Sequence, residues 1–208
     1  MKLILVDLKS QVVDAWKKLF QGYQAVEIAQ GSIFDIQCDA IVSPANSFGF
    51  MDGGIDMAIS RHFGWHVQDR VQALIQSKHH GELLVGVADI VATDDPQIPY
   101  VIAAPTMRVP MLLEPTSVNV YLATRAVLLL TKYGSFADGS AISEVVQQVA
   151  VPGMGTGVGG FPPTICAKQM KQAVDDVLRE SFTYPESWFE AQTRHQLLYG
   201  DDFRDLQY

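Results

Sequence analysis

The chain has 208 residues, of which 48% are hydrophobic and 18% are charged, a balance that fits a globular domain and excludes a disordered chain. Fifteen Lys and Arg against 23 Asp and Glu give a net charge of −8, so we expect no nucleic-acid partner, because binding a polyanion needs a basic face. The first apolar run is too short for a signal peptide or a membrane span, and Cys38 and Cys166 have no zinc-binding spacing. We therefore expect a cytoplasmic protein with no membrane partner, no cofactor and no metal.

The hydrophobic pattern predicts strands and helices that alternate along most of the chain. In chain order, we expect a strand at 3–6, a helix at 14–20 with Ser10 as its N-cap, strands at 24–28 and 39–42, and helices at 55–63 and 67–78. Strands at 83–91 and 100–104, a helix at 117–133, a strand at 145–151 and a helix at 163–178 follow. Such alternation predicts an α/β domain in which helices cover both faces of a sheet.

Residues 181–208 differ from the rest of the chain, because they are rich in aromatic residues and show no strand pattern. We expect one domain at 1–180 and a C-terminal aromatic extension at 181–208 that packs on or near it. One alternative function rests on this segment alone, namely a scaffold protein whose aromatic tail contacts another protein.

Two glycine-rich loops each follow a predicted strand and precede a predicted helix, which is where ligands bind in an open α/β sheet. The second loop, at 153–160, has five glycines in eight residues, so its backbone N–H groups can approach a phosphate or diphosphate closely. A flexible connector is the alternative. The same loop matches GxGxxG, but no strand with an acidic end follows it, which argues against a nicotinamide dehydrogenase.

The first loop, with DAIVxxAN at 39–46 and GGIDxAI at 53–59, resembles the macro domain family. The second loop matches in register, since PxxxTGVxGFP at 152–162 resembles the phosphate-binding loop of that family. The resemblance implies a three-layer α/β/α sandwich with a mixed central sheet that binds ADP-ribose. The closing strand of the family is not evident after Leu178, so the strand at 3–6 or part of the tail would complete the sheet.

By position, the resemblance assigns ligand contacts to both loops and to an early turn. Asn46 and Asp56 would be catalytic, with Asn46 hydrogen-bonding the distal ribose and Asp56 standing where the hydrolytic branch of the family has its acidic residue. The other ligand contacts would come from Ser32, Ile33, Ala45, Gly53, Gly54, Ile55, Gly155, Thr156, Gly157, Val158, Gly159, Gly160 and Phe161.

Both catalytic candidates suit this chemistry by their own properties. A carboxylate beside a bound diphosphate can orient or deprotonate a water, and the neighbouring negative charge raises its pKa. The alternative for Asp56 is a carboxylate at a helix start, stabilised by the helix dipole. Asn46 offers a donor and an acceptor to a ribose hydroxyl, and the alternative is an Asx turn after Pro44.

Three residues depart from the family pattern. Ser32 stands where the family has an adenine-binding aspartate, which predicts weaker adenine selectivity, because a hydroxyl is a weaker acceptor than a carboxylate. Gly159 stands where an aromatic residue commonly lies beside the distal ribose, so we expect a more open site. Asp52 interrupts a run of glycines and either raises the pKa of Asp56 or lies in solvent.

Some residues outside the two loops are also functional candidates. Residues 107–111 follow a strand of the same sheet and could form one wall of the cleft, where Arg108 either contacts a phosphate or stays in solvent. His62 and His66 are four residues apart, but without a third ligand they are better interpreted as surface or helix-end histidines than as a metal site.

These observations favour an enzyme that hydrolyses ADP-ribosyl esters, either protein-linked mono-ADP-ribose or O-acetyl-ADP-ribose. The competing hypothesis is a non-catalytic module that binds ADP-ribose or a related nucleotide. The expected partner is ADP-ribose or an ADP-ribosylated protein or metabolite, and the sequence leaves the oligomeric state open.

Overall fold

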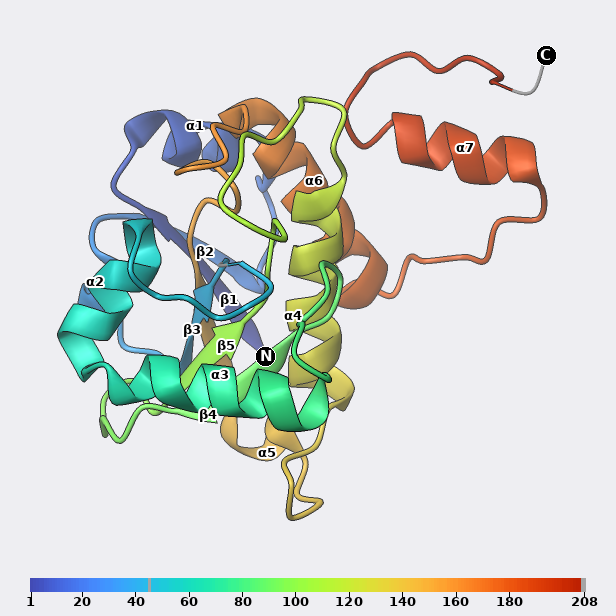
Figure 1. Cartoon of the computed structure of the whole chain (residues 1–208). Coiled ribbons are helices and arrows are strands. Elements are labelled where there is room, and N and C mark those ends of the chain that lie inside the picture. Colours follow the sequence, from blue (N-terminus) through green and yellow to red (C-terminus); the bar gives the residue numbers. More distant parts are fainter. Residues whose placement is uncertain (45, 207–208) are drawn as a thin grey trace.

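The computed structural model, which describes residues 1–44 and 46–206, has a six-stranded sheet at its centre (Figure 1). The strand order is β2-β1-β6-β3-β5-β4. Every neighbouring pair is parallel except β4 and β5, which are antiparallel, so the sheet is mixed, as expected. The strands are β1 (Lys2–Asp7), β2 (Val26–Gln30), β3 (Ala40–Ser43), β4 (Asp89–Ala92), β5 (Tyr100–Ala103) and β6 (Gln148–Val151).

Helices cover both faces of this sheet. Side chains alternate along β1, so that Leu3 and Leu5 pack with α1, α4 and α6, while Ile4 and Val6 pack with α2 and α3. This arrangement is the predicted three-layer α/β/α sandwich. The helices are α1 (Ser10–Leu19), α2 (Gly54–Phe63), α3 (His66–Lys78), α4 (Asn119–Tyr133), α5 (Ile142–Val145), α6 (Pro163–Val177) and α7 (Trp188–Gln196), with a 3-10 turn η1 (Ile33–Asp35).

Strand β1 lies inside the sheet, where it pairs with β2 on one side and with β6 on the other. Its four central residues are buried, which is why they form a continuous apolar run in the sequence. β1 therefore completes the sheet in place of a strand after Leu178. Because β1, β3 and β6 are parallel, their carboxyl ends, at Asp7, Ser43 and Val151, lie along the same edge.

Two predicted strands are longer than the observed ones. The predicted strand at 83–91 is mostly a loop, because Gly86 has a φ of +94° and only Asp89–Ala92 pairs with β5. The predicted strand at 145–151 begins at Gln148, since the residues before it form the short helix α5 and its end. Both errors arise where apolar residues lie outside the sheet, since Leu84 and Val145 are exposed although they continue an apolar run in the sequence.

The start of α1 also differs from the prediction. Ser10 is the first residue of the helix, and the N-cap is Lys9, which makes no side-chain capping bond. Instead, the Asp7 carboxylate accepts the backbone N–H of Lys9 at 2.8 Å. A side chain at the end of β1 therefore organises this turn.

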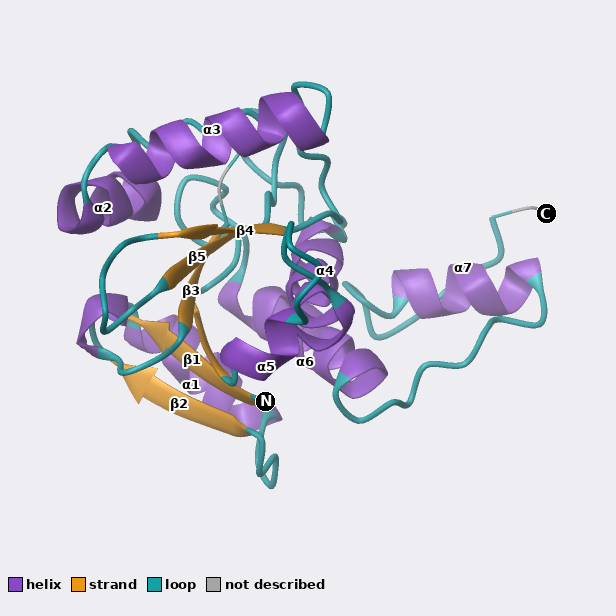
Figure 2. Cartoon of the chain, turned by 90° about the horizontal axis from the view of Figure 1, so that it is seen from below, coloured by secondary structure: helices purple, strands orange, loops and turns teal. Residues whose placement is uncertain are grey.

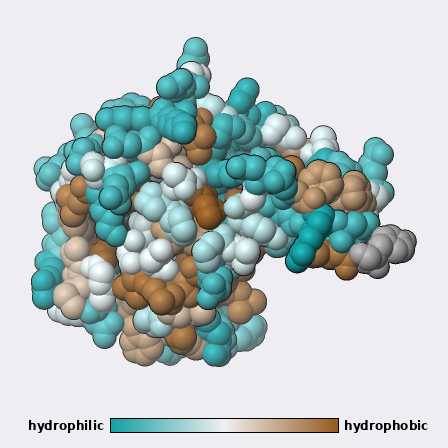
Figure 3. Space-filling model, turned by 90° about the horizontal axis from the view of Figure 1, so that it is seen from above, coloured by the Kyte–Doolittle hydropathy of each residue, from teal (hydrophilic) through white to brown (hydrophobic). Residues whose placement is uncertain are grey.

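Residues 181–206 project from the side of the sandwich (Figure 2). They contain α7, a helix that the sequence did not predict, and Trp188 in its first turn is 63% exposed. Figure 3 shows hydrophobic residues on this projecting arm. One contact with the sandwich joins the Lys168 Nζ of α6 to the carbonyl oxygen of Gly200 at 2.6 Å. Within residues 1–44 and 46–206, no helix has the length and hydrophobicity that crossing a membrane requires.

Candidate functional site

A cavity of about 190 Å³ opens where the chain leaves β1, β3, β5 and β6. Segments from both glycine-rich loops line it, so the fold brings the two sequence motifs to one place. The predicted site residues that line this first cavity are Asn46, Gly53, Gly54, Ile55, Asp56, Gly155, Thr156, Gly157, Val158 and Gly159.

A second cavity, of about 310 Å³, adjoins the first, and its lining includes Ser32 and Ile33. The two cavities together form one cleft. Gly160 and Phe161 line neither cavity, and Phe161 is buried in the core. Ala45 lies outside the residues that the structure describes. Five residues line both cavities: Asp7, Lys9, Gly54, Ile55 and Pro152.

Asp56 lies in the first turn of α2 and lines the first cavity, although only 7% of it is exposed. Ser43, the last residue of β3, donates its hydroxyl to Asp56 Oδ1 at 2.6 Å. Among the described residues, none donates a hydrogen bond to Asp56 Oδ2. This second oxygen is therefore available to a ligand or a water.

Burial raises the pKa of Asp56 to about 7, because the charged carboxylate loses solvation. The hydrogen bond from Ser43 lowers this pKa, and the negative charge of Asp52 raises it. Asp52 is exposed and its charge also acts on Asp56, so each of its two interpretations describes part of its role, and burial is the larger cause of the shift. Near neutral pH, the charged and protonated forms of Asp56 coexist, which suits a general base.

Asn46 uses most of its side chain to shape the first loop. Its Oδ1 accepts the backbone N–H groups of Phe48 at 3.1 Å and Phe50 at 3.3 Å, and its Nδ2 donates to the carbonyl oxygen of Phe50 at 2.8 Å. The first of these contacts is an Asx turn. Because an amide nitrogen carries two hydrogens, one N–H of Asn46 remains for a ligand in the cavity.

Helix α2 begins beside the cavity without a side-chain cap. Its N-cap is Gly53, so the backbone N–H groups of the first turn have no partner inside the helix. Gly54 has a φ of +56°, in the left-handed region that favours glycine. These N–H groups and the positive end of the helix dipole are thus available to an anion.

The second loop is a compact turn. The Thr156 hydroxyl donates to the carbonyl oxygen of Gly153 at 2.8 Å, and Gly155 has a φ of +71°. A Cβ at Gly153 would lie 2.7 Å from Asp7 Oδ2, so a larger side chain does not fit there. Such contacts are typical of a loop with one fixed shape rather than of a flexible connector.

The macro domain family model matches residues 42–170, a span that includes both loops. The chain belongs to the macro domain family. An uncharacterised protein of Aquifex aeolicus (strain VF5) is similar to this macro domain, with 35% identity over 150 residues that cover 72% of this chain and 80% of that protein.

Solved macrodomain structures have the same fold. A variant of the Oceanobacillus iheyensis macrodomain with ADPR matches with a TM-score of 0.59 and 21% identity, over 72% of this chain and 76% of that one. The macrodomain of Mycobacterium tuberculosis DarG matches with a TM-score of 0.54 and 18% identity, over 73% of this chain and 88% of that one. The predicted macro fold is confirmed.

Gly159 packs closely against the segment after β5. The backbone N–H of Leu113 donates to the carbonyl oxygen of Gly159 at 2.8 Å, and the Leu113 side chain is buried. A Cβ at Gly159 would lie 2.5 Å from the carbonyl oxygen of Gly155 and 3.1 Å from the Leu113 Cγ. Leu113 lines neither cavity, so this contact fixes the shape of the second loop, and the more open site expected from Gly159 stays a prediction.

Asp7 and Lys9 are site residues that sequence reasoning missed. Asp7 Oδ2 accepts the backbone N–H of Gly153 at 3.0 Å, and Lys9 Nζ donates to the carbonyl oxygen of Thr156 at 2.7 Å. The usable signal was that Asp7 ends the first strand. Once β1 is placed inside a parallel sheet, its carboxyl end must lie at the ligand-binding edge.

The loop after β5 behaves partly as predicted. Met107 lines the first cavity and so forms part of its wall. Arg108 does not line the cleft, because its Nε donates to Glu82 Oε1 at 2.6 Å and its guanidinium lies over the Phe48 ring. The interpretation of Arg108 as a phosphate ligand is therefore not supported.

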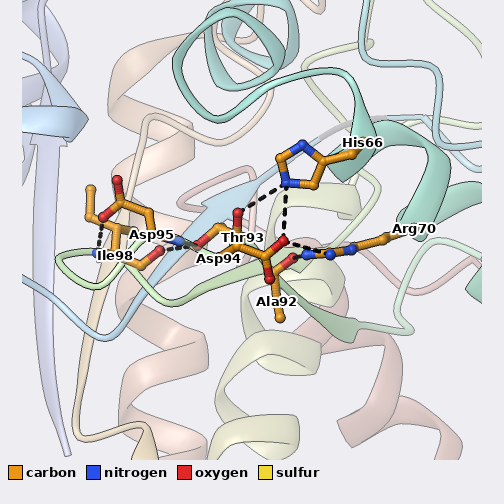
Figure 4. A network of polar contacts seen from close by, with 7 residues as sticks. All are labelled: His66, Arg70, Ala92, Thr93, Asp94, Asp95 and Ile98. Atoms are coloured by element: carbon orange, nitrogen blue, oxygen red, sulfur yellow. Dashed lines mark hydrogen bonds and ion pairs between the residues drawn. The ribbon is translucent and has the colours of Figure 1, made fainter.

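His62 and His66 make separate contacts. The His66 ring hydrogen-bonds to the carbonyl oxygen of Thr93 at 3.0 Å and lies 3.7 Å from Asp94, which Arg70 also contacts (Figure 4). His62 stacks on an aromatic ring of η1. In the described part of the chain, no group of three His, Cys, Asp or Glu side chains is arranged to hold a metal. His66 instead joins α3 to the loop after β4.

Proposed function

We propose that this macro domain binds ADP-ribose in its cleft and hydrolyses ADP-ribosyl esters, either on proteins or as O-acetyl-ADP-ribose. The observation that carries the proposal is Asp56, a buried carboxyl that lines the cleft and has its pKa raised to about 7. A solved structure of a variant of the Oceanobacillus iheyensis macrodomain, which has the same fold, contains ADPR.

The diphosphate is the centre of the proposed binding mode. It would accept hydrogen bonds from the first turn of α2 and from the second loop, since both line the first cavity. The adenosine half would occupy the second cavity, beside Ser32 and Ile33. The distal ribose would lie near Asp56 and take the remaining N–H of Asn46.

Ser32 supports weaker adenine selectivity in this binding mode. Its Oγ already accepts the backbone N–H of Phe34 at 3.3 Å, so one of the two acceptor lone pairs of this neutral hydroxyl is occupied. The exocyclic amino group of adenine needs an acceptor. Ser32 therefore meets this requirement less well than a carboxylate would.

In the proposed reaction, Asp56 acts as a general base. Its Oδ2 takes a proton from a water whose oxygen adds to the ester carbonyl carbon, while Ser43 holds Oδ1. The bond between the acyl carbon and the ribose oxygen then breaks. That oxygen takes the proton from Asp56, and the products are ADP-ribose and a free carboxylic acid. Such general-base catalysis contributes about 10²–10⁴-fold to a rate.

A non-catalytic ADP-ribose-binding module is the second candidate function. The hydrogen bonds of Asn46 favour it, because Asn46 Oδ1 is already occupied by two backbone N–H groups and cannot also orient a water strongly. Product analysis separates the two candidates. A binding module would leave an ADP-ribosyl ester intact beyond its spontaneous hydrolysis.

The experiment that tests the proposed function compares the wild type with Asp56→Asn on an ADP-ribosyl ester. We expect turnover to fall at least about 100-fold, because the base is lost. The affinity for ADP-ribose should stay within a few fold. Asp69→Asn is the matched control, since Asp69 is an exposed carboxylate in the first turn of α3 that lines neither cavity, and this variant should retain the wild-type turnover.

Each other outcome of this experiment overturns part of the proposal. Full turnover by Asp56→Asn would remove Asp56 from the mechanism. Absence of turnover by the wild type, together with binding of ADP-ribose, would favour the binding module.

The setting of this activity is also part of the proposal. Both cysteines are free and buried, which supports a reducing, cytoplasmic compartment.

We take residues 1–180 as the macro domain and 181–208 as its extension. The end of α6 at Val177 and the arm that projects beyond it support this division.

A further inference from the structure

The N-terminal unit of β1 and α1 lies outside the span that the macro domain family model matches, which is 42–170. It nevertheless brings two charged residues, Asp7 and Lys9, into the cleft. The family resemblance therefore says nothing about them, and their role has to be inferred from the contacts that they make.

The cleft is short of positive charge. Among the described residues that line the two cavities, Asp7, Asp52 and Asp56 are acidic and Lys9 alone is basic. A diphosphate carries negative charge at neutral pH, so Asp7 and Asp52 oppose its binding, and the partly charged Asp56 adds to this repulsion. Backbone N–H groups supply only partial charges, which leaves Lys9 as the full positive charge that can offset this repulsion.

The position of Lys9 suits contact with a diphosphate. Lys9 lines both cavities, so it lies where they meet and where the group joining the two halves of a dinucleotide-like ligand has to pass. Its Nζ donates one hydrogen bond, to the carbonyl oxygen of Thr156 at 2.7 Å. Because an ammonium group has three N–H donors, two remain for phosphate oxygens.

Asp7 holds this arrangement in place. Its Oδ1 accepts the backbone N–H of Lys9 at 2.8 Å, and its Oδ2 accepts the backbone N–H of Gly153 at 3.0 Å. One carboxylate thus joins the backbone that carries the ammonium group to the loop that would bind the phosphates. Lys9 and the second loop therefore form one unit.

We propose that Lys9 binds the diphosphate of the ligand through its free N–H groups. This inference rests on the proposed function, because it concerns the same cleft. It adds a contact from outside the family motifs, and it makes the affinity of this protein depend on the charge of the ligand.

The test measures the affinity of the whole chain for ADP-ribose by calorimetry, for the wild type, Lys9→Met and Lys9→Arg. Loss of a charge-assisted hydrogen bond should weaken binding about 10–100-fold in Lys9→Met, and Lys9→Arg should recover most of it. Lys17→Met is the matched control, because Lys17 is an exposed lysine of α1, the helix that Lys9 precedes, and lies about 12 Å further along the helix axis. It should bind like the wild type.

Salt dependence separates a charge contact from a merely structural one. Between about 0.01 M and about 1 M salt, the Debye length falls from about 30 Å to about 3 Å. The wild-type affinity should fall steeply over this range, and that of Lys9→Met should fall less. If Lys9→Met bound more weakly but kept the wild-type salt dependence, Lys9 would act only by holding Thr156, and the inference would be overturned.

The remaining outcomes are also decisive. Equal affinity of the wild type and Lys9→Met would overturn the role of Lys9 and leave the proposed function standing. Failure of the wild type to bind ADP-ribose at any salt concentration would overturn both. Thermal unfolding of each variant shows whether a loss of affinity comes from a loss of folding.

Discussion

The two loops that line the first cavity contribute to it by different means. The loop after β3 presents side chains, since Ser43 and Asp56 form a buried pair and Asn46 shapes the turn between them. The loop after β6 presents mostly backbone, because contacts at Gly153 and Gly159 leave no room for larger side chains. The first loop is thus suited to chemistry and the second to holding a ligand.

This difference has a consequence for stability. A buried carboxylate with no cationic partner destabilises the folded state when it is charged, whereas a turn made of glycines has no such cost at any pH. Substitutions in the two loops should therefore be distinguishable by how their effects depend on pH.

The largest expected effect is the pH dependence that Asp56 gives to the free energy of unfolding. The pKa of Asp56 rises from an ordinary 3.8 to about 7 on folding, so between these values the folded state holds the proton more tightly than the unfolded state. The contribution of this group to the free energy of unfolding is present below about pH 4 and is lost as the pH rises through about 7, by up to about 4 kcal/mol. Asp56→Asn, which does not titrate, should lack this loss.

Urea unfolding of the wild type and Asp56→Asn, at acid and at mildly alkaline pH, checks this prediction. The stability of the variant relative to the wild type should increase from the acid to the alkaline condition. The same pH dependence in both proteins would show that Asp56 ionises normally, and the comparison of the two loops would lose its physical basis.

A smaller effect is expected in the second loop. Gly155 has a φ of +71°, and a Cβ there would lie 2.8 Å from the Leu113 Cδ1, so Gly155→Ala should cost about 1–3 kcal/mol. The control is Gly157→Ala, because a Cβ at Gly157 has no atom within 4 Å. Thermal unfolding should show a midpoint lowered by several degrees for Gly155→Ala and almost unchanged for Gly157→Ala. Equal midpoints would mean that the loop is not tightly packed.

The smallest effect concerns Ser43, which stabilises the charged form of Asp56. Ser43→Ala should raise the pKa of Asp56 further, so the rise of turnover with pH should move to higher pH. Turnover at pH 7 should fall several-fold and recover in alkali. Ser60→Ala is the matched control, since this buried serine of α2 donates to the carbonyl oxygen of Met51 instead. A wild-type pH profile for Ser43→Ala would contradict the role given to this hydrogen bond.

Most of the fold could be predicted from the sequence, because its strands and helices have clear hydrophobic periods. The errors lie where an apolar run does not join the sheet, as in the loop around Gly86, where Leu84 and Val87 are exposed. The helix α7 was missed, since its aromatic residues are exposed and give no apolar stripe facing a core.

Site residues that belong to a continuous sequence motif could be predicted. Site residues that come together only through the pairing of distant strands could not. Asn46 and Asp56 belong to one continuous motif, whereas Asp7 and Gly153 are 146 positions apart and meet only because β1 pairs with β6. The packing of Leu113 against Gly159 is likewise a tertiary contact that no local pattern indicates.

The most direct test of the central claim, that both loops bind one ligand, is calorimetric titration of the protein with ADP-ribose, AMP and ribose 5-phosphate. The last two ligands are the halves of the first. We expect ADP-ribose to bind at least about tenfold more tightly than either half, which is about 1.4 kcal/mol. Absence of ADP-ribose binding at millimolar concentration, or equal affinities for all three ligands, would contradict the account.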